Sequence, residues 1–166
     1  MSENGLVPIA EHLEETPITR RISRSKGATR VQYGALPYRL TKTRSVELLL
    51  VTSRETKRWI IPKGWPIDGL KPFNSAAQEA YEEAGIRGTV GKRPVGTYAY
   101  KKRGRVGGRC ISCEVTVFPL LVKAQRGRWP EQHQRRTRWV SRRKAISLIA
   151  DRKLRALISE FRNPGA

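Results

Sequence analysis

The sequence is poor in cysteine, in long apolar runs and in acidic residues. Its 166 residues include only 2 cysteines, so we expect no disulfide framework, and a reducing cytoplasm is the expected location. No apolar run approaches the roughly 20 residues that a membrane-spanning helix needs. The first thirty residues contain no apolar stretch between a basic start and a cleavage site, so we expect no secretory signal.

The shortage of acids leaves a strong excess of positive charge. The chain has 34 lysines and arginines against 14 aspartates and glutamates, a formal net charge of +20. Such a field attracts polyanions and raises their encounter rate. Nucleic acid, polyphosphates, an anionic membrane surface and highly phosphorylated metabolites all fit, as does a basic solvated surface without a dedicated partner. Weak, non-specific nucleic-acid binding is one expectation, and charge alone selects no partner.

Composition divides the chain into a leader and a body. Residues 1–30 are polar and show no strong period, so we expect a flexible tail or an arm on the body. Residues 31–163 mix strands with few helices, which predicts one α+β domain. Pro37 favours an edge position or a bulge for the first strand. Strands are expected at 32–39, 46–52, 59–61, 95–100 and 110–122, and late helices at 141–150 and 153–161.

One more helix is predicted over residues 75–85 from its end signals and its apolar spacing. Ser75 and Gln78 match a capping box, in which each side chain satisfies a backbone donor near the other, and Asn74 is an alternative cap. Gly85 stands where a left-handed residue ends a helix. A single apolar stripe follows helical spacing; it consists of Ala77, Ala80, Tyr81 and Ala84.

The opposite face of this helix carries Glu79, Glu82 and Glu83. Like charges three and four positions apart cost a helix about 0.2–0.5 kcal/mol per pair, and no lysine or arginine within the helix offsets them. A hard divalent cation such as Mg²⁺ would relieve the repulsion by binding carboxylate oxygens. A solvated acidic face is the alternative. The gathering of these three acids in an acid-poor chain favours a metal site.

The residues from Gly64 through Ile86 resemble the Nudix box, G-x5-E-x7-R-E-U-x-E-E-x-G-U, in which U is aliphatic. Six residues fall in register with it, and Ala80 occupies an aliphatic position; the six are Gly64, Glu79, Glu82, Glu83, Gly85 and Ile86. The likeness extends over residues 31–161. It is nearest to the diphosphoinositol polyphosphate phosphohydrolase branch of the Nudix hydrolases.

The resemblance implies an α/β/α sandwich built on a mixed β-sheet, with the box forming a loop–helix–loop. It also implies hydrolysis of a phosphoanhydride with Mg²⁺ or Mn²⁺. By the same likeness Glu79, Glu82 and Glu83 bind the metal and serve catalysis, helped by a backbone carbonyl near Lys63 or Gly64. One of these glutamates would also orient or deprotonate the attacking water. Bound metal and nearby cations would neutralise charge on the phosphate oxygens.

Two positions depart from the box. Leu70 stands where the first glutamate is expected, and Gln78 replaces the arginine. Losing both together leaves no partner stranded, and Gln78 would serve the cap instead. We favour a pyrophosphohydrolase of a highly anionic substrate, such as a diphosphoinositol polyphosphate or a dinucleoside polyphosphate. An RNA-end pyrophosphohydrolase and a Nudix-fold sensor that binds its ligand without turnover are the alternatives.

Basic residues near the box are the candidate substrate ligands. Lys63 precedes the box glycine and is the first choice, with Arg39 and Arg58 near the early strands. The basic, glycine-rich segment 101–109 is either a clamp on phosphates or a solvated hairpin loop; its candidates are Lys101, Arg103 and Arg105. Glu131 is an outlying candidate for a metal ligand or a base, although a surface loop is the favoured interpretation.

Overall fold

The computed structural model of the chain describes residues 29–103 and 110–163, whose centre is an eight-stranded mixed sheet. The strands are β1 (Arg30–Leu40), β2 (Val46–Thr52), β3 (Trp59–Ile60), β4 (Lys63–Gly64), β5 (Ile86–Val90), β6 (Gly96–Arg103), β7 (Cys110–Gln125) and β8 (Thr137–Ser141). Their main order is β3-β2-β1-β7-β5, with β4 beside β1, β6 beside β7 and β8 beside β2. The pair β1–β7 is parallel and the other pairs are antiparallel.

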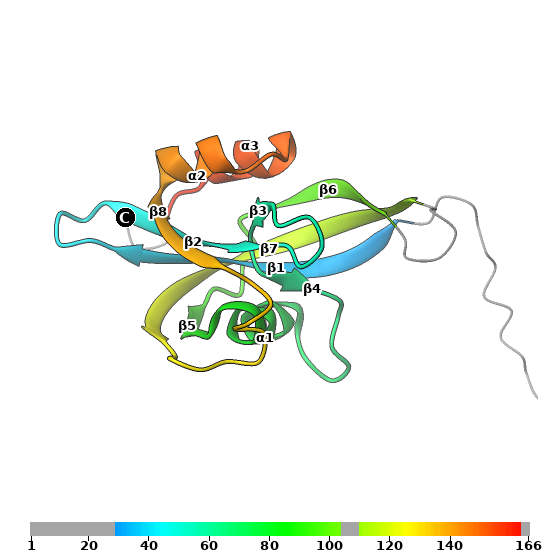
Figure 1. Ribbon diagram of the computed structural model, residues 1–166, viewed down its shortest axis with the longest axis horizontal. Helices are drawn as coiled ribbons and strands as arrows, with labels where there is room; N and C mark the ends of the chain where they lie inside the picture. The colour runs from blue at the N-terminus through cyan, green and yellow to red at the C-terminus, as the bar shows by residue number, and fades with distance from the viewer. Residues whose placement is uncertain (1–28, 104–109, 164–166) are drawn as a thin grey trace, which may run out of the picture.

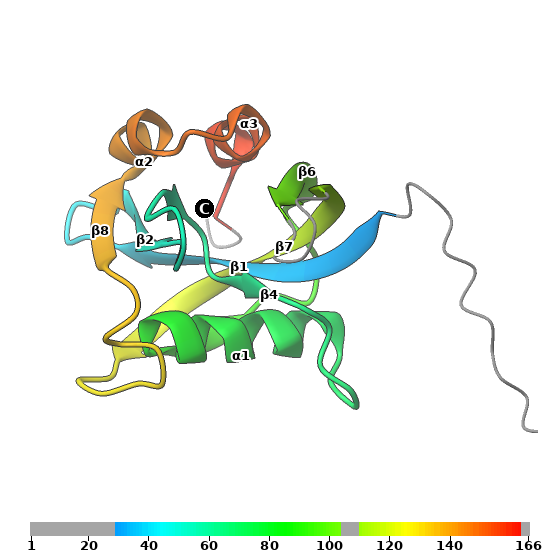
Figure 2. The same ribbon diagram turned by 45° about the vertical axis from the view of Figure 1, so that its right-hand side comes forward.

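Helices cover both faces of this sheet, as Figures 1 and 2 show. Helix α1 (Pro72–Ala84) lies on one face, and α2 (Arg142–Leu148) and α3 (Arg152–Glu160) lie on the other. The predicted α/β/α sandwich is therefore confirmed. No helix in the described part of the chain is long and apolar enough to cross a membrane. The leader lies almost wholly outside the described residues, so the division at residue 30 stays a prediction.

Strand β2 shows why two helical layers are needed. Leu48 and Leu50 pack in the core beneath α2 and α3, while Leu49 and Val51 pack in the core on the α1 side. All four are fully buried. Successive side chains of a strand point to opposite faces, so an unbroken apolar run requires cover on both. The strand was predicted over these same residues.

The first strand corrects one expectation, because β1 lies in the middle of the sheet despite Pro37. Along its parallel ladder with β7, Pro37 is the register partner of Leu120. On its other side β1 pairs with β4 at Tyr33 and Gly34, and with β2 only from Tyr38 onward. Pro37 therefore falls where β1 changes partner, and the missing N–H breaks no ladder bond there.

Helix α1 begins earlier than predicted and without the expected capping box. Its N-cap is Lys71, which makes no side-chain cap bond, and Pro72 opens the first turn, where its lack of an N–H costs nothing. Ser75 is instead buried inside the helix, where its Oγ accepts a bond from the Ile67 N–H at 3.3 Å. The predicted end is confirmed, since Gly85 has φ 70° and caps the helix.

The buried face of α1 differs from the predicted stripe. Small residues at four-residue spacing, Ala76, Ala80 and Ala84, are completely buried and let the helix lie close to the sheet. Tyr81 and Ala77 are only partly buried. Glu83 is also on the buried side, with 3% of its surface exposed. The helix therefore does not carry its three glutamates on one solvated face.

Candidate active site

The carboxylate of Glu79 lies directly over the backbone of Gly64. A Cβ on Gly64 would stand 2.0 Å from Glu79 Oε1, and the nearest atoms that it would meet all belong to this carboxylate. Strand β4 places the glycine there by pairing Gly64 with Tyr33 of β1. Burial, followed by repulsion from Glu82 and Glu131, raises the pKa of Glu79 to about 7. Gly64 and Glu79, the first two of the six residues that fall in register with the box, are thus brought together.

Glu83 is a buried carboxylate with one oxygen engaged and one unengaged. Its Oε1 forms an ion pair with Arg135 Nη2, and both side chains are almost fully buried. Its Oε2 is buried and has no hydrogen-bond partner among the described residues. Burial raises the pKa of Glu83 to about 8, although Arg135 pulls it down. An unengaged buried oxygen is costly, so this atom is the clearest sign of an expected ligand.

Arg135 connects α1 with the loop that precedes β8. Besides Glu83, its guanidinium bonds the Glu131 carboxylate through Nε and the Thr52 carbonyl oxygen through Nη1 at 3.0 Å. Arg54 adds an exposed ion pair to Glu131 at 3.6 Å. The sequence interpretation did not single out Arg135. Glu131, favoured as a surface loop residue, is instead held next to the box glutamates by two arginines.

The same loop is fixed to the end of α1 by further bonds. The Glu131 N–H donates to the Glu82 carbonyl oxygen at 3.0 Å, and Trp129 Nε1 donates to the Glu83 carbonyl oxygen at 3.2 Å. The Trp129 ring lies so close to Gly85 that a Cβ there would stand 2.7 Å from it. These contacts position Glu131 and Arg135 relative to the helix that carries the candidate ligands.

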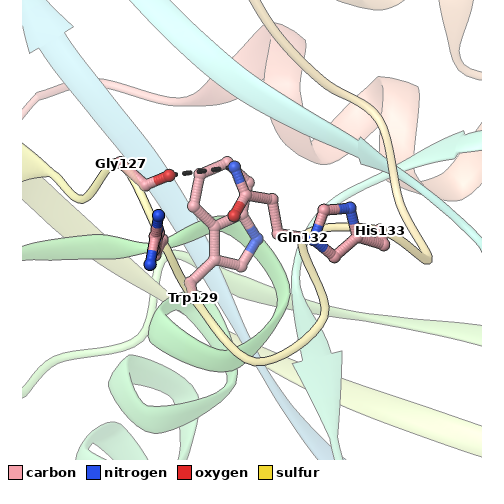
Figure 3. A pocket seen from close by; sticks show the side chains of 5 residues that line it. Gly127, Trp129, Gln132 and His133 are labelled. Carbon is pink, nitrogen blue, oxygen red and sulfur yellow. Dashed lines mark hydrogen bonds between the residues drawn. The ribbon is translucent and has the colours of Figure 1, made fainter.

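An open depression lies at Trp129, shown in Figure 3. It has a volume of about 510 Å³ and is lined by Gly127, Arg128, Trp129, Gln132 and His133. Its rim is tied by a bond from Gln132 Nε2 to the Gly127 carbonyl oxygen at 2.9 Å. None of the predicted site residues lines it. Glu79, Glu82 and Glu83 therefore do not line the depression. Trp129 forms part of its wall and also contacts Gly85 at the end of α1.

Gln78 and Leu70, the two departures from the box, have different surroundings in the structure. Gln78 Nε2 donates to Glu82 Oε1 at 2.7 Å, one helical turn away. The expectation that Gln78 caps the helix is therefore wrong. Leu70 is 42% exposed in the preceding loop. Leu70 carries no charge and so leaves no buried charge unpaired. Neither Leu70 nor Gln78 therefore disturbs the helix.

Lys63 lies on the other side of β4 from the Glu79 carboxylate, in a partly buried position. Its Nζ donates to the Tyr100 hydroxyl at 2.9 Å, and this hydroxyl donates to Gln32 Oε1 at 2.7 Å. Burial lowers the pKa of Lys63 to about 8, while Glu83 acts to raise it. The charges of Lys63 and Glu83 therefore interact, and the role of Lys63 as a substrate ligand stays a prediction.

The other predicted substrate ligands are not brought together with the carboxylates. Arg39 pairs with Glu47 and stacks on Trp139 near the far end of β1 from Gly64. Arg58 is exposed in the turn before β3. Lys101 is exposed on β6, where it alternates with Tyr100 and so points to the opposite face.

The remaining two basic candidates are Arg103 and Arg105. Arg105 and residues 104–109 lie outside the described residues. Arg103 is described only as the last residue of β6. Whether this segment clamps a phosphate therefore stays a prediction.

The donor set fits a divalent cation in its chemistry. Glu79 and Glu83 are carboxylates whose lost solvation a cation would offset, and Glu83 Oε2 is without a partner. Among the described residues no three acidic, histidine or cysteine side chains converge as a ready-made metal cluster. In this conformation Glu82 is bonded to Gln78 and Glu83 to Arg135. The assignment of Glu79, Glu82, Glu83 and Gly64 as metal ligands stays a prediction.

The chain is similar in sequence to plant proteins that share one family name. It is 29% identical over 147 residues to Nudix hydrolase 13, mitochondrial, of Arabidopsis thaliana, covering 80% of this chain and 73% of that protein. It is 32% identical over 128 residues to Nudix hydrolase 18, mitochondrial, of the same plant, covering 73% of this chain and 69% of that protein. No protein-family model matches the chain.

A solved structure shares the fold. The crystal structure of a C. elegans Ap4A hydrolase binary complex superimposes with a TM-score of 0.60 at 20% identity, covering 80% of this chain and 95% of that chain. Diphosphoinositol polyphosphate phosphohydrolase 3-alpha of Mus musculus is 44% identical, but over 50 residues, 30% of each chain. The likeness to that branch is therefore confined to one segment.

Proposed function

We propose that this chain, which belongs to the Nudix hydrolase superfamily, is a metal-dependent pyrophosphohydrolase of highly anionic substrates. The observation that carries the proposal is the pairing of Glu79 over Gly64 with the buried Glu83, whose Oε2 has no partner among the described residues. Burying two carboxylates next to each other in the fold costs free energy unless a cation offsets their lost solvation. The same residues are those that the box spacing selects.

In this proposal Glu79, Glu82 and Glu83 hold Mg²⁺ or Mn²⁺ with the help of a backbone carbonyl at Gly64. The bound cation would neutralise charge on the non-bridging phosphate oxygens. One of the glutamates orients the attacking water and accepts its proton.

Positive residues then handle the phosphates. Lys63 Nζ, held by Tyr100, lies close enough to Glu83 to influence its pKa, so a phosphate at the carboxylates is also within the field of this lysine. Arg135 keeps Glu83 in place and supplies a second positive charge behind it. We propose that this arrangement holds the reacting phosphate while water displaces the leaving group in line.

The substrate that we propose is a diphosphoinositol polyphosphate or a dinucleoside polyphosphate. The net charge of +20 favours a ligand with several phosphates over a singly linked diphosphate. The 50-residue likeness to a diphosphoinositol polyphosphate phosphohydrolase agrees with this class. We keep the cytoplasm as the proposed location from cysteine usage, although both Arabidopsis relatives are named mitochondrial; fractionation of native cells tests it.

The decisive experiment is a hydrolysis screen with Mg²⁺ or Mn²⁺ over diphosphoinositol polyphosphates, dinucleoside polyphosphates and 5′-triphosphorylated RNA. Glu82→Gln and Glu83→Gln should lose activity, because each keeps the side-chain shape and removes the metal-binding charge. Glu114→Gln is the matched control, because Glu114 is exposed on β7. Turnover that survives both site substitutions would contradict the metal assignment. Preference for the RNA would select the RNA-end alternative.

A sensor that binds without turnover is a second candidate, and one contact favours it. Gln78 engages Glu82 Oε1 in the position of the box arginine, so the positive charge expected beside this proposed ligand is missing. Under this alternative the protein binds a polyphosphate with wild-type affinity and releases no phosphate with either metal. Measuring binding and turnover on the same preparation separates the two functions.

A further inference from the structure

A group of cations and aromatic rings lies one residue beyond the box glycine. The guanidinium carbon of Arg30 stands 4.4 Å from the ring centroid of Trp65, and Lys102 Nζ stands 5.4 Å from it. Lys63 Nζ lies 4.5 Å from the ring centroid of Tyr100. We name this group, Arg30, Lys63, Trp65, Tyr100 and Lys102, the Trp65 cluster.

Sheet topology assembles the Trp65 cluster from distant parts of the sequence. Figure 1 shows the start of β1, the end of β6 and the start of β7 at the same end of the sheet. Cys113 of β7 is the register partner of Arg30 on one side and of Tyr100 on the other, so these side chains share a face. Lys102 follows Tyr100 by two residues and points to the same face.

The opposite face at this end carries a different set of charges. Glu114 is the register partner of both Val31 and Ala99, so it points away from the Trp65 cluster. Lys101 shares that opposite face, because it precedes Lys102 by one residue in β6. None of the ion pairs found among the described residues includes Arg30, Lys63 or Lys102. The sheet thus separates the three cations from the nearest carboxylate on its strands.

We propose that the Trp65 cluster is a phosphate-binding subsite for the substrate's non-reacting phosphates, which rests on the proposed function. Guanidinium and ammonium groups donate charge-assisted hydrogen bonds to phosphate oxygens, and mutual repulsion of the three cations is relieved when an anion lies among them. Trp65 and Tyr100 hold the cations in place through their rings. Trp65 follows Gly64 in the chain, and the Glu79 carboxylate lies over Gly64, so the proposal places one extended substrate across both.

The cluster favours phosphate over a nucleobase as its occupant. A base would stack on the face of Trp65, but Arg30 and Lys102 already contact this ring. Stacking therefore requires that a cation be displaced, whereas a phosphate binds with both in place. The subsite selects substrates with phosphates beyond the reacting bond.

Binding of inorganic tripolyphosphate, measured by calorimetry without divalent metal and at fixed ionic strength, tests the subsite independently of turnover. Lys102→Gln and Arg30→Gln should each weaken binding about tenfold, the loss of one charge-assisted contact. Lys101→Gln and Arg39→Gln are the matched controls, because each removes one positive charge from the same strand as its test variant. Lys101 points to the other face of β6, and Arg39 lies near the far end of β1. Each control should weaken binding less than twofold. Equal losses in Lys101→Gln and Lys102→Gln would mean a general field effect and overturn the proposal, as would no binding by the wild type.

Kinetics on dinucleoside polyphosphates of increasing phosphate number give the second test. Lys102→Gln should lower kcat/KM for the longer substrates about tenfold and leave the shortest within twofold. Equal losses for every length would contradict the subsite. If the wild type hydrolyses neither these substrates nor diphosphoinositol polyphosphates, the proposed function fails, and tripolyphosphate binding still decides the subsite. Weaker binding of adenosine monophosphate in Trp65→Leu, with Lys102→Gln unaffected, would overturn the proposal in favour of base stacking.

Discussion

Arg135 and Glu83 form an ion pair inside the protein although 52 positions separate them in sequence. The arginine side chain is 7% exposed, and it also bonds Glu131 and the Thr52 carbonyl oxygen. One guanidinium therefore joins the end of β2, helix α1 and the loop before β8. Buried guanidinium groups are tolerated only when their donors are satisfied, and here three different acceptors do so.

Replacing Arg135 with leucine should destabilise the protein by about 3 kcal/mol, at the lower end for a broken buried pair, because Glu83 can take up a proton. Urea unfolding measures the loss. Arg138→Leu is the control, since Arg138 is exposed on β8. Adding Glu83→Gln to Arg135→Leu should recover part of the stability, because no buried charge then remains unpaired. Additive losses in the double variant would show that the two side chains are not coupled.

Local spacing accounts for the parts of the site that sequence could predict. Gly64 and Glu79 meet because the loop–helix–loop between them is a short continuous segment, so a fixed spacing encodes their contact. The unbroken apolar run of β2 required cover on both faces, which set its place in the sheet. Gly85 ends α1 because a left-handed residue is needed there.

Long-range pairing accounts for what was missed. Nothing near Arg135 marks it as different from the other arginines of its loop, since its partners come from β2 and α1. Lys101 was predicted as a ligand, and the structure places it on the opposite face of β6 from Lys102. Sequence alone did not establish which face each of these residues takes. Pro37 was placed at an edge because the change of partner along β1 is a tertiary feature.

Gly64→Ala should abolish most of the activity while leaving stability nearly unchanged. The three atoms nearest to the new methyl group would all belong to the Glu79 carboxylate, the free end of a flexible side chain, so we expect the carboxylate to move and the fold to stay. We expect kcat to fall on the order of 100-fold, as for a misplaced reacting group, and unfolding free energy to change by less than about 1 kcal/mol. Gly127→Ala is the control, because nothing lies within 4 Å of its Cβ. A stable variant with full activity would refute the role of this contact.

Gln78→Ala should change the metal dependence of turnover. The bond from Gln78 holds Glu82 Oε1 in one orientation, and losing such a supporting contact weakens metal binding about tenfold. A titration of activity against Mg²⁺ measures the shift, which should appear in the metal concentration for half-maximal rate. Gln132→Ala removes an equivalent amide at the separate depression and should not alter it. An unchanged titration in Gln78→Ala would indicate that Glu82 does not bind the metal.

Stability without metal should fall as pH rises from about 4.5 to about 8. Burial raises the pKa values of Glu79 and Glu83 from 4.5 to about 7 and about 8, so the folded protein binds more protons than the unfolded chain in this interval. The free energy of unfolding decreases wherever the folded state holds the extra protons. Lys63, whose pKa is lowered from 10.5 to about 8, acts above this interval, where its effect raises stability with pH.

Urea unfolding in a chelator at pH 5.5 and pH 8 measures this decrease, and Glu83→Gln supplies the comparison, because the amide does not titrate and should flatten the profile. Mg²⁺ binds the deprotonated carboxylates, so it should stabilise the wild type more at pH 8 than at pH 5.5. Glu114→Gln, which removes an exposed carboxylate, should keep the wild-type slope. A wild-type profile that rises with pH in the chelator would mean that the two glutamates are already ionised in the folded protein. In that case Arg135 and Lys63 would outweigh the lost solvation, and a metal would bind to charges that are already present.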